Sequence, residues 1–235
     1  MMANRLLRRS GVAVALIAEL LEWKPSVIFQ VGVGTHHKET EVFQEVWPDA
    51  ELIGWEPHPE IFKRIKDPLC IDVDDFPGEL HQCALGKYTG RRDFYYDAAH
   101  VEGASFFGGE KFQSISVKVR SMDDCYPPPE NAETLFWLDC EGAELEVLEG
   151  AVEFIKGVDV INIELTGVPP RVGWPSPVEV NRWLLDHGFF SQYIHTHRCT
   201  SGQNDMVYVK PELFRPEYCS CPLQVEDFWR KQGNC

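Results

Sequence analysis

Short runs of almost uninterrupted apolar residues recur along this chain, and a segment with helical spacing follows most of them. Four such runs stand out, at residues 27–31, 52–55, 135–138 and 160–163. A run without polar alternation is typical of a strand that is covered on both faces, as in a parallel sheet. Strands that alternate with helices therefore predict an α/β fold, a doubly wound and mostly parallel sheet in a single domain.

Helical patterns fill the intervals between these runs. We expect helices at residues 38–47, 61–65, 143–155 and 178–186. The third has the clearest pattern, because its apolar side chains recur at spacings of three and four. Residues 83–85 resemble a further short strand.

Two regions depart from this alternation. Residues 92–96 and 114–119 alternate between polar and apolar, and a glycine-rich stretch separates them, so we expect two antiparallel strands joined by a mobile loop. Within that loop, residues 105–109 are a candidate lid. Residues 189–194 and 206–209 predict an antiparallel hairpin at one edge of the sheet, which makes the last strand antiparallel.

The N-terminal segment imitates a secretion signal, since arginines precede an apolar stretch. Glu19 and Glu22 interrupt that stretch and no clear cleavage site follows, so we interpret residues 1–25 as a lead helix packed on the sheet edge. The main domain is expected at residues 26–210, with residues 211–235 as a tail packed on or near it. With neither an export signal nor a membrane span in view, the expected location is the cytoplasm.

The charge of the chain argues against some classes of partner. The formal net charge is -15, and no basic face is visible in the sequence. Nucleic acids and anionic membranes attract basic surfaces, so we expect neither as a partner and leave the oligomeric state open.

Cysteines and histidines gather near the end of the chain without a recognisable metal pattern. They are His195, His197, Cys199, Cys219, Cys221 and Cys235. Their spacing fits no standard zinc finger, so we predict no metal site.

Several chemically active residues stand where the predicted strands end. They are Gly32 and Gly34 after the first run, Glu56 after the second, Asp139 and Glu141 after the third, and Glu164 after the fourth. Open parallel sheets bind ligands beyond the carboxyl ends of their strands. Each residue alone is also compatible with an ordinary turn, a helix cap or a surface carboxylate, but four such ends in one chain predict a ligand cleft.

The first two strand ends indicate the kind of ligand. Gly32 and Gly34 allow a tight turn and a close backbone approach. Glu56 follows about twenty residues later, where an acid accepts hydrogen bonds from the two hydroxyls of a ribose. The dinucleotide pattern Gly-x-Gly-x-x-Gly is incomplete, because His37 stands at the third glycine position. A ribose ligand without pyrophosphate, such as S-adenosylmethionine, fits better than a nicotinamide cofactor, and a nicotinamide-dependent oxidoreductase is the second hypothesis.

One segment resembles a known family. Residues 136–151, Phe-Trp-Leu-Asp-Cys-Glu-Gly-Ala-Glu-Leu-Glu-Val-Leu-Glu-Gly-Ala, are similar to the hallmark of FkbM-type methyltransferases, in which a strand precedes Asp-x-Glu-Gly-Ala-Glu and a helix ends in Gly-Ala. Weaker similarities follow the family order at residues 54–59, 83–90, 119–124, 163–164 and 204–209. The resemblance covers residues 26–210.

The resemblance implies a class I methyltransferase fold, a seven-stranded sheet that binds S-adenosylmethionine and releases S-adenosylhomocysteine. It also implies transfer to an oxygen, often a hydroxyl of a sugar or another small molecule. The cofactor-binding positions implied by the family are Gln30, Gly32, Gly34 and His36 at the methionine moiety, Glu56 and Pro57 at the ribose, and Gln82 and Ala84 near the adenine. Asp139, Glu141 and Glu164 would lie at the reaction end.

Two positions depart from the family pattern. Gln30 stands where the family commonly has Asp, and His36 where it commonly has Gly. Gln30 can still accept a hydrogen bond from the amino group of the ligand, but without a full charge. We therefore expect weaker cofactor affinity or a rearranged loop, and a non-catalytic member that binds the cofactor stays open as a third hypothesis.

A hydroxyl acceptor benefits from a base as its proton leaves. Asp139 is the first candidate, because desolvation at the end of a buried strand raises a carboxyl pKa. Capping the next helix is its alternative role, and Glu141 is expected in the first turn of that helix. Glu164 either binds the acceptor or closes a strand. His195 and His197 are reserve candidates.

Overall fold

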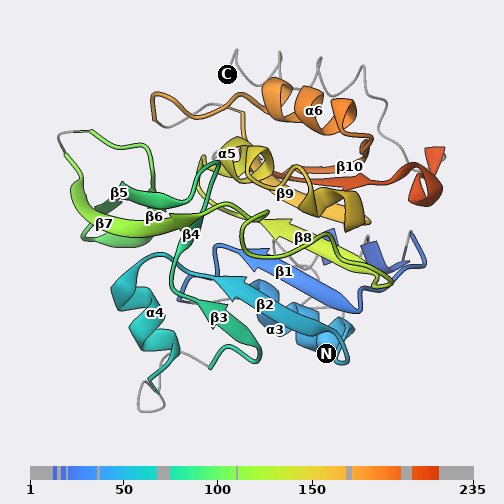
Figure 1. The fold of residues 1–235 in the computed structure, drawn as a ribbon, viewed down its shortest axis with the longest axis horizontal. Helices are drawn as coiled ribbons and strands as arrows, with labels where there is room; N and C mark the ends of the chain where they lie inside the picture. The colour runs from blue at the N-terminus through green and yellow to red at the C-terminus, as the bar shows by residue number, and fades with distance from the viewer. Residues whose placement is uncertain are drawn as a thin grey trace.

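The computed structural model describes residues 13–14, 17–19, 21–35, 38–67, 75–109, 111–167, 171–196 and 203–216. Its main sheet has seven strands in the order β10-β11-β9-β8-β1-β2-β3 (Figure 1). These are β1 (Val27–Val31), β2 (Glu51–Trp55), β3 (Glu79–His81), β8 (Thr134–Leu138), β9 (Val160–Thr166), β10 (Phe190–Thr196) and β11 (Gln203–Val209). The first five run parallel, whereas β11 is antiparallel to both of its neighbours. The predicted sheet with an antiparallel last strand is confirmed.

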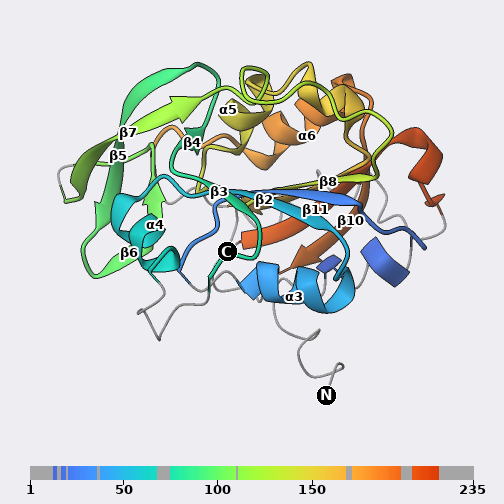
Figure 2. The same cartoon turned by 60° about the horizontal axis from the view of Figure 1, so that its bottom comes forward.

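Helices cover both faces of this sheet (Figure 2). One face carries α5 (Glu144–Glu149), the short η1 (Phe154–Gly157) and α6 (Pro177–Asp186), and the other carries α3 (Lys38–Val46) and α4 (Pro59–Ile65). Side chains alternate between the two cores along each strand. In β8, Phe136 belongs to the α5 core and Trp137 to the α3 core. Burial on both faces is the physical reason why the strands read as uninterrupted apolar runs.

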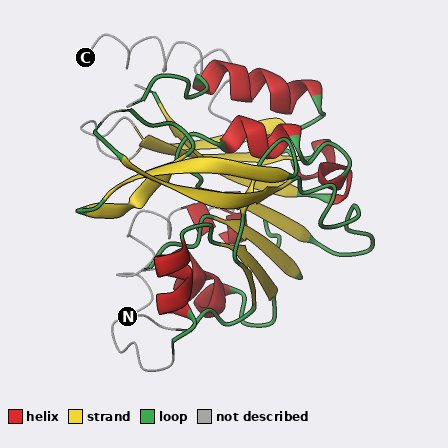
Figure 3. Cartoon of the chain, turned by 60° about the vertical axis from the view of Figure 1, so that its left-hand side comes forward, coloured by secondary structure: helices red, strands yellow, loops and turns green. Residues whose placement is uncertain are grey.

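A second sheet is formed by the part of the chain between β3 and β8. It has the order β4-β7-β5-β6, formed by β4 (Ala84–Leu85), β5 (Gly90–Asp97), β6 (His100–Ser105) and β7 (Gln113–Arg120). It lies beside the edge toward which the arrowheads of β1, β2 and β8 point, and Figure 3 shows it from that side. The predicted antiparallel pair is confirmed, with Arg92 opposite Val117.

One sequence prediction in this region is wrong. Residues 100–105, expected in a loop, form β6, which pairs with β5. The short strand predicted at residues 83–85 is present as β4, but it pairs with β7 in the second sheet and not with the main sheet. The true third strand, β3, is only three residues long and none of its residues is buried, so it has no apolar run to reveal it.

The long helix predicted at residues 143–155 is divided in two. A side chain at Gly150 would place its Cβ 2.1 Å from the carbonyl oxygen of Gly86, so the chain is pressed against the second sheet there. The Asp123 carboxylate accepts hydrogen bonds from the backbone N–H of Glu153 (3.1 Å) and of Phe154 (2.8 Å). These bonds cap the start of η1. A contact from another element therefore decides where the helix stops.

The other helices agree with the sequence patterns. Helix α6 begins at Pro177 behind a capping box made by Ser176 and Glu179, and Gly188 follows its end with φ +85°. Strand β9, however, continues to Thr166, so Glu164 lies inside the strand and does not close it.

The described parts of the two ends pack on the domain. Ala13, Val14 and Ile17 are helical and buried in the α3 core, and residues 211–213 form the short η2 (Pro211–Leu213). The remainder of the predicted tail, residues 217–235, lies outside the described residues. Within the described segments, every helix falls short of the length and hydropathy needed to cross a membrane.

The Asp123 cap makes a prediction about stability. Asp123→Ala removes the acceptor for two backbone N–H groups and should lower the free energy of unfolding by about 1–2 kcal/mol, measured by urea denaturation. Glu130→Ala, at a nearby exposed carboxylate, is the matched control and should change it by less than about 0.5 kcal/mol. Equal effects of the two substitutions would show that the cap is not what stabilises this break.

Candidate active site

Three strand ends meet at Gly32. This residue has φ +83°, and a Cβ added to it would lie 1.8 Å from the carbonyl oxygen of Asp139. Its N–H donates to the carbonyl of Trp55 at 3.1 Å, while the N–H of Asp139 donates to the carbonyl of Val31 at 3.0 Å. Only glycine fits such a position. The carboxyl ends of β2, β1 and β8 are therefore held together here.

Glu56 lies directly against the glycine loop. Its carboxylate accepts hydrogen bonds from the N–H of Gly34 at Oε2 (3.0 Å) and from the N–H of His58 at Oε1 (2.7 Å). Glu56 is only 4% exposed, and Gly34 has φ +64°. The structure thus brings together the two features on which the sequence prediction of a ribose site depends.

Gln30 is placed differently from the sequence expectation. Its side chain is fully buried, and its Oε1 accepts a hydrogen bond from the hydroxyl of Thr40 in α3 at 2.8 Å. The oxygen expected to accept from the amino group of the ligand therefore already has a partner. Among the described residues, Gln30 Nε2 has no hydrogen-bond partner. His36, the other departure from the family pattern, lies outside the described residues.

The residues expected near the ribose and the adenine differ in their exposure to solvent. Pro57 is half-buried beside Glu56, and Gln82 is exposed just after β3. Ala84 is buried on β4, and its side chain belongs to the α5 core. The Ala84 methyl group therefore packs in the core, whereas the Gln82 side chain is exposed to solvent.

Acidic side chains from neighbouring strands form a row at the reaction end. In the sheet register, Leu138 is opposite Ile163, so Asp139 lies level with Glu164, and Glu164 is opposite Asp205. Asp205 is buried. Asp205 lies in the segment 204–209, which resembles the family, but the sequence predicted no role for it. A single acidic residue in an apolar strand does not show which residues it contacts.

The pKa values of the carboxyl groups at this end of the sheet are raised. Burial raises the pKa of Asp139 well above its usual range, and the charges of Glu164 and Glu141 raise it further. Burial, followed by repulsion from Asp205, raises the pKa of Glu164 to about 8. Burial also raises the pKa of Glu141, which the Arg171 guanidinium opposes. Carboxyl groups that hold protons near neutral pH are typical of sites that exchange protons with a ligand.

The turn after β8, at residues 139–143, is held by the side chain of Glu144, a role that was not predicted from the sequence. Glu144 is buried, and its Oε1 accepts hydrogen bonds from the N–H of Cys140 (3.2 Å) and of Gly142 (3.1 Å). Burial raises the pKa of Glu144 to about 7. Glu141 and Gly142 both have positive φ, +50° and +96°, so the helix starts only at Glu144.

Two alternatives for the hallmark residues are therefore wrong. Glu141 precedes α5 instead of lying in its first turn, because its backbone conformation is not helical. The N-cap of α5 is Ala143, and no side chain makes a capping bond there, so Asp139 is not a helix cap.

The second sheet is tied to this turn. Ser105 donates from Oγ to the carbonyl of Glu141 at 2.6 Å. Arg171 donates to the carbonyls of Phe107 (2.7 Å) and Gly103 (2.6 Å). Ser105 and Phe107, which both belong to the predicted lid at residues 105–109, are thus hydrogen-bonded to the turn after β8 and to the loop after β9.

The reserve histidines are only partly described. His195 is opposite Asp205 in the pairing of β10 with β11, but its side chain is not among the described ones, and His197 lies outside the described residues. Of the described residues, no group of three or more His, Cys, Asp or Glu is arranged to hold a metal ion.

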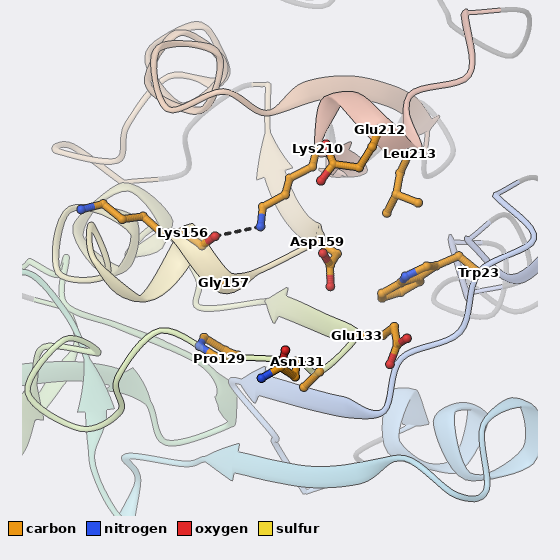
Figure 4. A pocket seen from close by; sticks show the side chains of 11 residues that line it. Trp23, Pro129, Asn131, Glu133, Lys156, Gly157, Asp159, Lys210, Glu212 and Leu213 are labelled. Carbon is orange, nitrogen blue, oxygen red and sulfur yellow. Dashed lines mark hydrogen bonds between the residues drawn. The ribbon is translucent and has the colours of Figure 1, made fainter.

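A separate hollow lies at the opposite end of the sheet (Figure 4). It has a volume of about 480 Å³, and its lining includes Glu133 and Asp159, which precede β8 and β9, and Lys210, which follows β11. Asp159 accepts from the N–H of Thr134 at 2.8 Å, and Lys210 donates to the carbonyl of Lys156 at 2.8 Å. These polar groups hold the amino ends of the strands, away from the predicted cleft.

Comparison with known proteins decides the family. The model of the methyltransferase FkbM domain matches residues 31–191. The chain belongs to the FkbM methyltransferase family. The hexuronic acid methyltransferase AglP of Haloferax volcanii is 24% identical over 169 residues, which cover 70% of this chain and 66% of AglP. The chain thus spans just under two thirds of the length of that relative.

Solved methyltransferase structures resemble this FkbM domain at low identity. The magnesium protoporphyrin IX methyltransferase of Synechocystis PCC 6803 with bound SAM has 9% identity and a TM-score of 0.49, over 86% of this chain and 77% of that one. An O-methyltransferase family 2 protein of Planctomyces limnophilus in complex with apigenin has 15% identity and a TM-score of 0.48, over 89% and 59%.

The FkbM domain has the class I methyltransferase fold and takes S-adenosylmethionine as its cofactor. The residues present fit that cofactor. Gly32 and Gly34, both with positive φ, present bare backbone in the loop after β1, and the N–H groups of Gly34 and His58 hold the Glu56 carboxylate against that loop. The antiparallel β11 between β9 and β10 also disfavours the nicotinamide oxidoreductase hypothesis.

The raised pKa values of the FkbM site predict how its stability depends on pH. A carboxyl whose pKa is higher in the folded protein stabilises the fold fully below its unfolded pKa, and this is lost as pH rises through the folded pKa. For Glu164 the window runs from 4.5 to about 8. We expect the free energy of unfolding to fall across this window, measured by urea denaturation at several pH values.

Glu164→Gln should reduce the slope of the free energy of unfolding against pH by up to about 1.4 kcal/mol per pH unit. Glu130→Gln, at an exposed site, should keep the wild-type slope. If Glu164→Gln also keeps it, Glu164 does not retain its proton in the folded protein.

Proposed function

We propose that this chain transfers a methyl group from S-adenosylmethionine to a hydroxyl oxygen of a small molecule or sugar. The observation that carries the proposal is the row of Asp139, Glu164 and Asp205 beside the glycine loop, because a hydroxyl acceptor needs a base where the methyl group is delivered. The sugar acceptor is supported by the similarity to a hexuronic acid methyltransferase.

The cofactor, when bound, supplies an activated methyl group on a sulfonium centre. Glu56 accepts hydrogen bonds from the ribose hydroxyls, and the Gly32–Gly34 backbone contacts the methionine moiety. Because Glu56 is already oriented by two backbone N–H groups, little reorganisation is needed on binding.

The acidic row handles the proton of the acceptor. Asp139 is the first candidate for the base and Glu164 the second, and repulsion between them favours a state in which one holds a proton while the other is ionised. The ionised carboxylate would take the hydroxyl proton as the acceptor oxygen bonds to the methyl carbon, while the carbon–sulfur bond breaks and its electron pair leaves with S-adenosylhomocysteine. Glu141, on the turn held by Ser105, orients the acceptor from the side of the second sheet.

Cofactor binding tests the first part of the proposal. Wild-type protein should bind S-adenosylhomocysteine in calorimetry, and Glu56→Ala should weaken binding about tenfold to a hundredfold by removing a charged acceptor. Glu56→Gln, which keeps the shape and one acceptor oxygen, should give an intermediate value. Glu60→Gln, at an exposed carboxylate in α4, is the matched control. Unchanged affinity in Glu56→Ala, or binding of NADH in its place, contradicts the assignment.

Turnover tests the second part. With labelled S-adenosylmethionine and a panel of sugars, uronic acids and other hydroxyl compounds, Asp139→Asn and Glu164→Gln should each reduce kcat about a hundredfold while S-adenosylhomocysteine affinity stays near wild type. The wild-type rate should rise as pH increases through about 8, because the carboxylate acts as a base only when ionised. Cofactor binding without transfer to any compound would favour the non-catalytic hypothesis.

A further inference from the structure

One histidine beside Glu56 is buried without a partner for its ring. His58 is only 2% exposed. Within the described part of the chain, neither Nδ1 nor Nε2 has a hydrogen-bond partner. An unsatisfied buried polar group destabilises a fold, and the imidazole has two such nitrogens. Such a cost points to a partner that binds the ring, such as a ligand.

The position of His58 relates it to the cofactor site. Its backbone N–H donates to Glu56 Oε1 at 2.7 Å, while Gly34 donates to the other oxygen of the same carboxylate at 3.0 Å. Glu56 therefore separates the glycine loop on one side from His58 on the other. His58 is also the residue just before α4, next to the carboxyl end of β2 (Figure 1).

The second sheet closes the other side of the ring. Tyr96, from β5, packs edge-on against His58 with the ring centroids 5.0 Å apart and an interplanar angle of 79°. Tyr96 is itself half-buried. His58 thus lies between the end of β2 and the second sheet. Strand β3, which pairs with β2, is followed directly by Gln82.

The ring is neutral in this environment. Burial lowers the pKa of His58 below its ordinary value of 6.5, although Glu60 opposes the shift. A neutral imidazole offers one N–H donor and one acceptor nitrogen. That combination suits an uncharged heterocycle with both donors and acceptors on its edge, and it suits phosphate or carboxylate less.

We propose that one ring nitrogen of His58 hydrogen-bonds the adenine base of the cofactor and so contributes to selection of the base. This inference rests on the proposed placement of the ribose at Glu56. In S-adenosylmethionine the ribose lies between the methionine moiety and the base, so a methionine moiety at Gly32–Gly34 sends the base to the His58 side of Glu56. Adenine carries ring nitrogens that accept and an amino group that donates, and either can pair with a neutral imidazole.

Two ligands that differ only in the base provide the test. S-adenosylhomocysteine carries adenine, and S-ribosylhomocysteine has the same ribose and homocysteine without it. Affinities for both are measured by calorimetry, or by competition for the weaker one, in wild type, His58→Phe and Tyr96→Phe. Melting temperatures show that each variant is folded.

His58→Phe should weaken S-adenosylhomocysteine about fivefold to tenfold and leave S-ribosylhomocysteine unchanged, because only the former can use the lost hydrogen bond. Tyr96→Phe keeps the ring contact and should behave as wild type toward both. Glu56→Gln should weaken both ligands, since both contain the ribose. If it weakens neither, the ribose placement itself is wrong, which is a different failure from that of His58.

Nuclear magnetic resonance of protein labelled with ¹⁵N in histidine gives a second readout. The His58 ring signals, assigned by their loss in His58→Phe, should shift on addition of S-adenosylhomocysteine and also of adenosine. Unchanged signals, wild-type affinity of His58→Phe, or equal weakening of both ligands would overturn the proposal and leave His58 a structural residue.

Discussion

The close approach between the Gly32 backbone and the Asp139 carbonyl is the contact on which the site depends. A Cβ at Gly32 would lie 1.8 Å from that oxygen, so the two strand ends can meet only without a side chain. Their meeting brings the glycine loop beside the hallmark turn. It also aligns the end of β2, because the Gly32 N–H donates to the Trp55 carbonyl. Cofactor-binding and acidic residues from separate parts of the chain thereby share one edge.

The fold tolerates repulsion between carboxylates at that edge because packing on both faces of the sheet stabilises it. Asp139, Glu164 and Asp205 come from three strands whose pairing is fixed by long apolar runs on both faces. The sheet therefore holds buried carboxyl groups close together. Burial raises the pKa values of Asp139 and Glu164, and repulsion from the neighbouring carboxylates raises them further. Stability given up at functional sites in this way is expected when surrounding packing compensates.

The hallmark segment shows how one motif serves structure and chemistry together. Glu144 holds the turn through the N–H groups of Cys140 and Gly142, and Gly142 must lack a side chain because a Cβ there would lie 2.4 Å from the Trp174 ring. Asp139 and Glu141 then project from a braced turn. The second sheet completes this arrangement through Ser105, which binds the Glu141 carbonyl.

The sequence alone predicted most of the main sheet, because strands that are buried on both faces appear as local apolar runs followed by turn residues. It also indicated Gly32, Gly34, Glu56, Asp139 and Glu164 as strand-end residues, although β9 runs past Glu164. The end of α5 at Glu149, the strand β3, and the positions of Asp205 opposite Glu164, Glu144 under the turn after β8 and His58 beside Glu56 became visible only in the folded structure. These features depend on contacts between residues far apart in the chain, such as Asp123 with Phe154 and Asp205 with Glu164. A local sequence pattern does not show which distant residues come into contact.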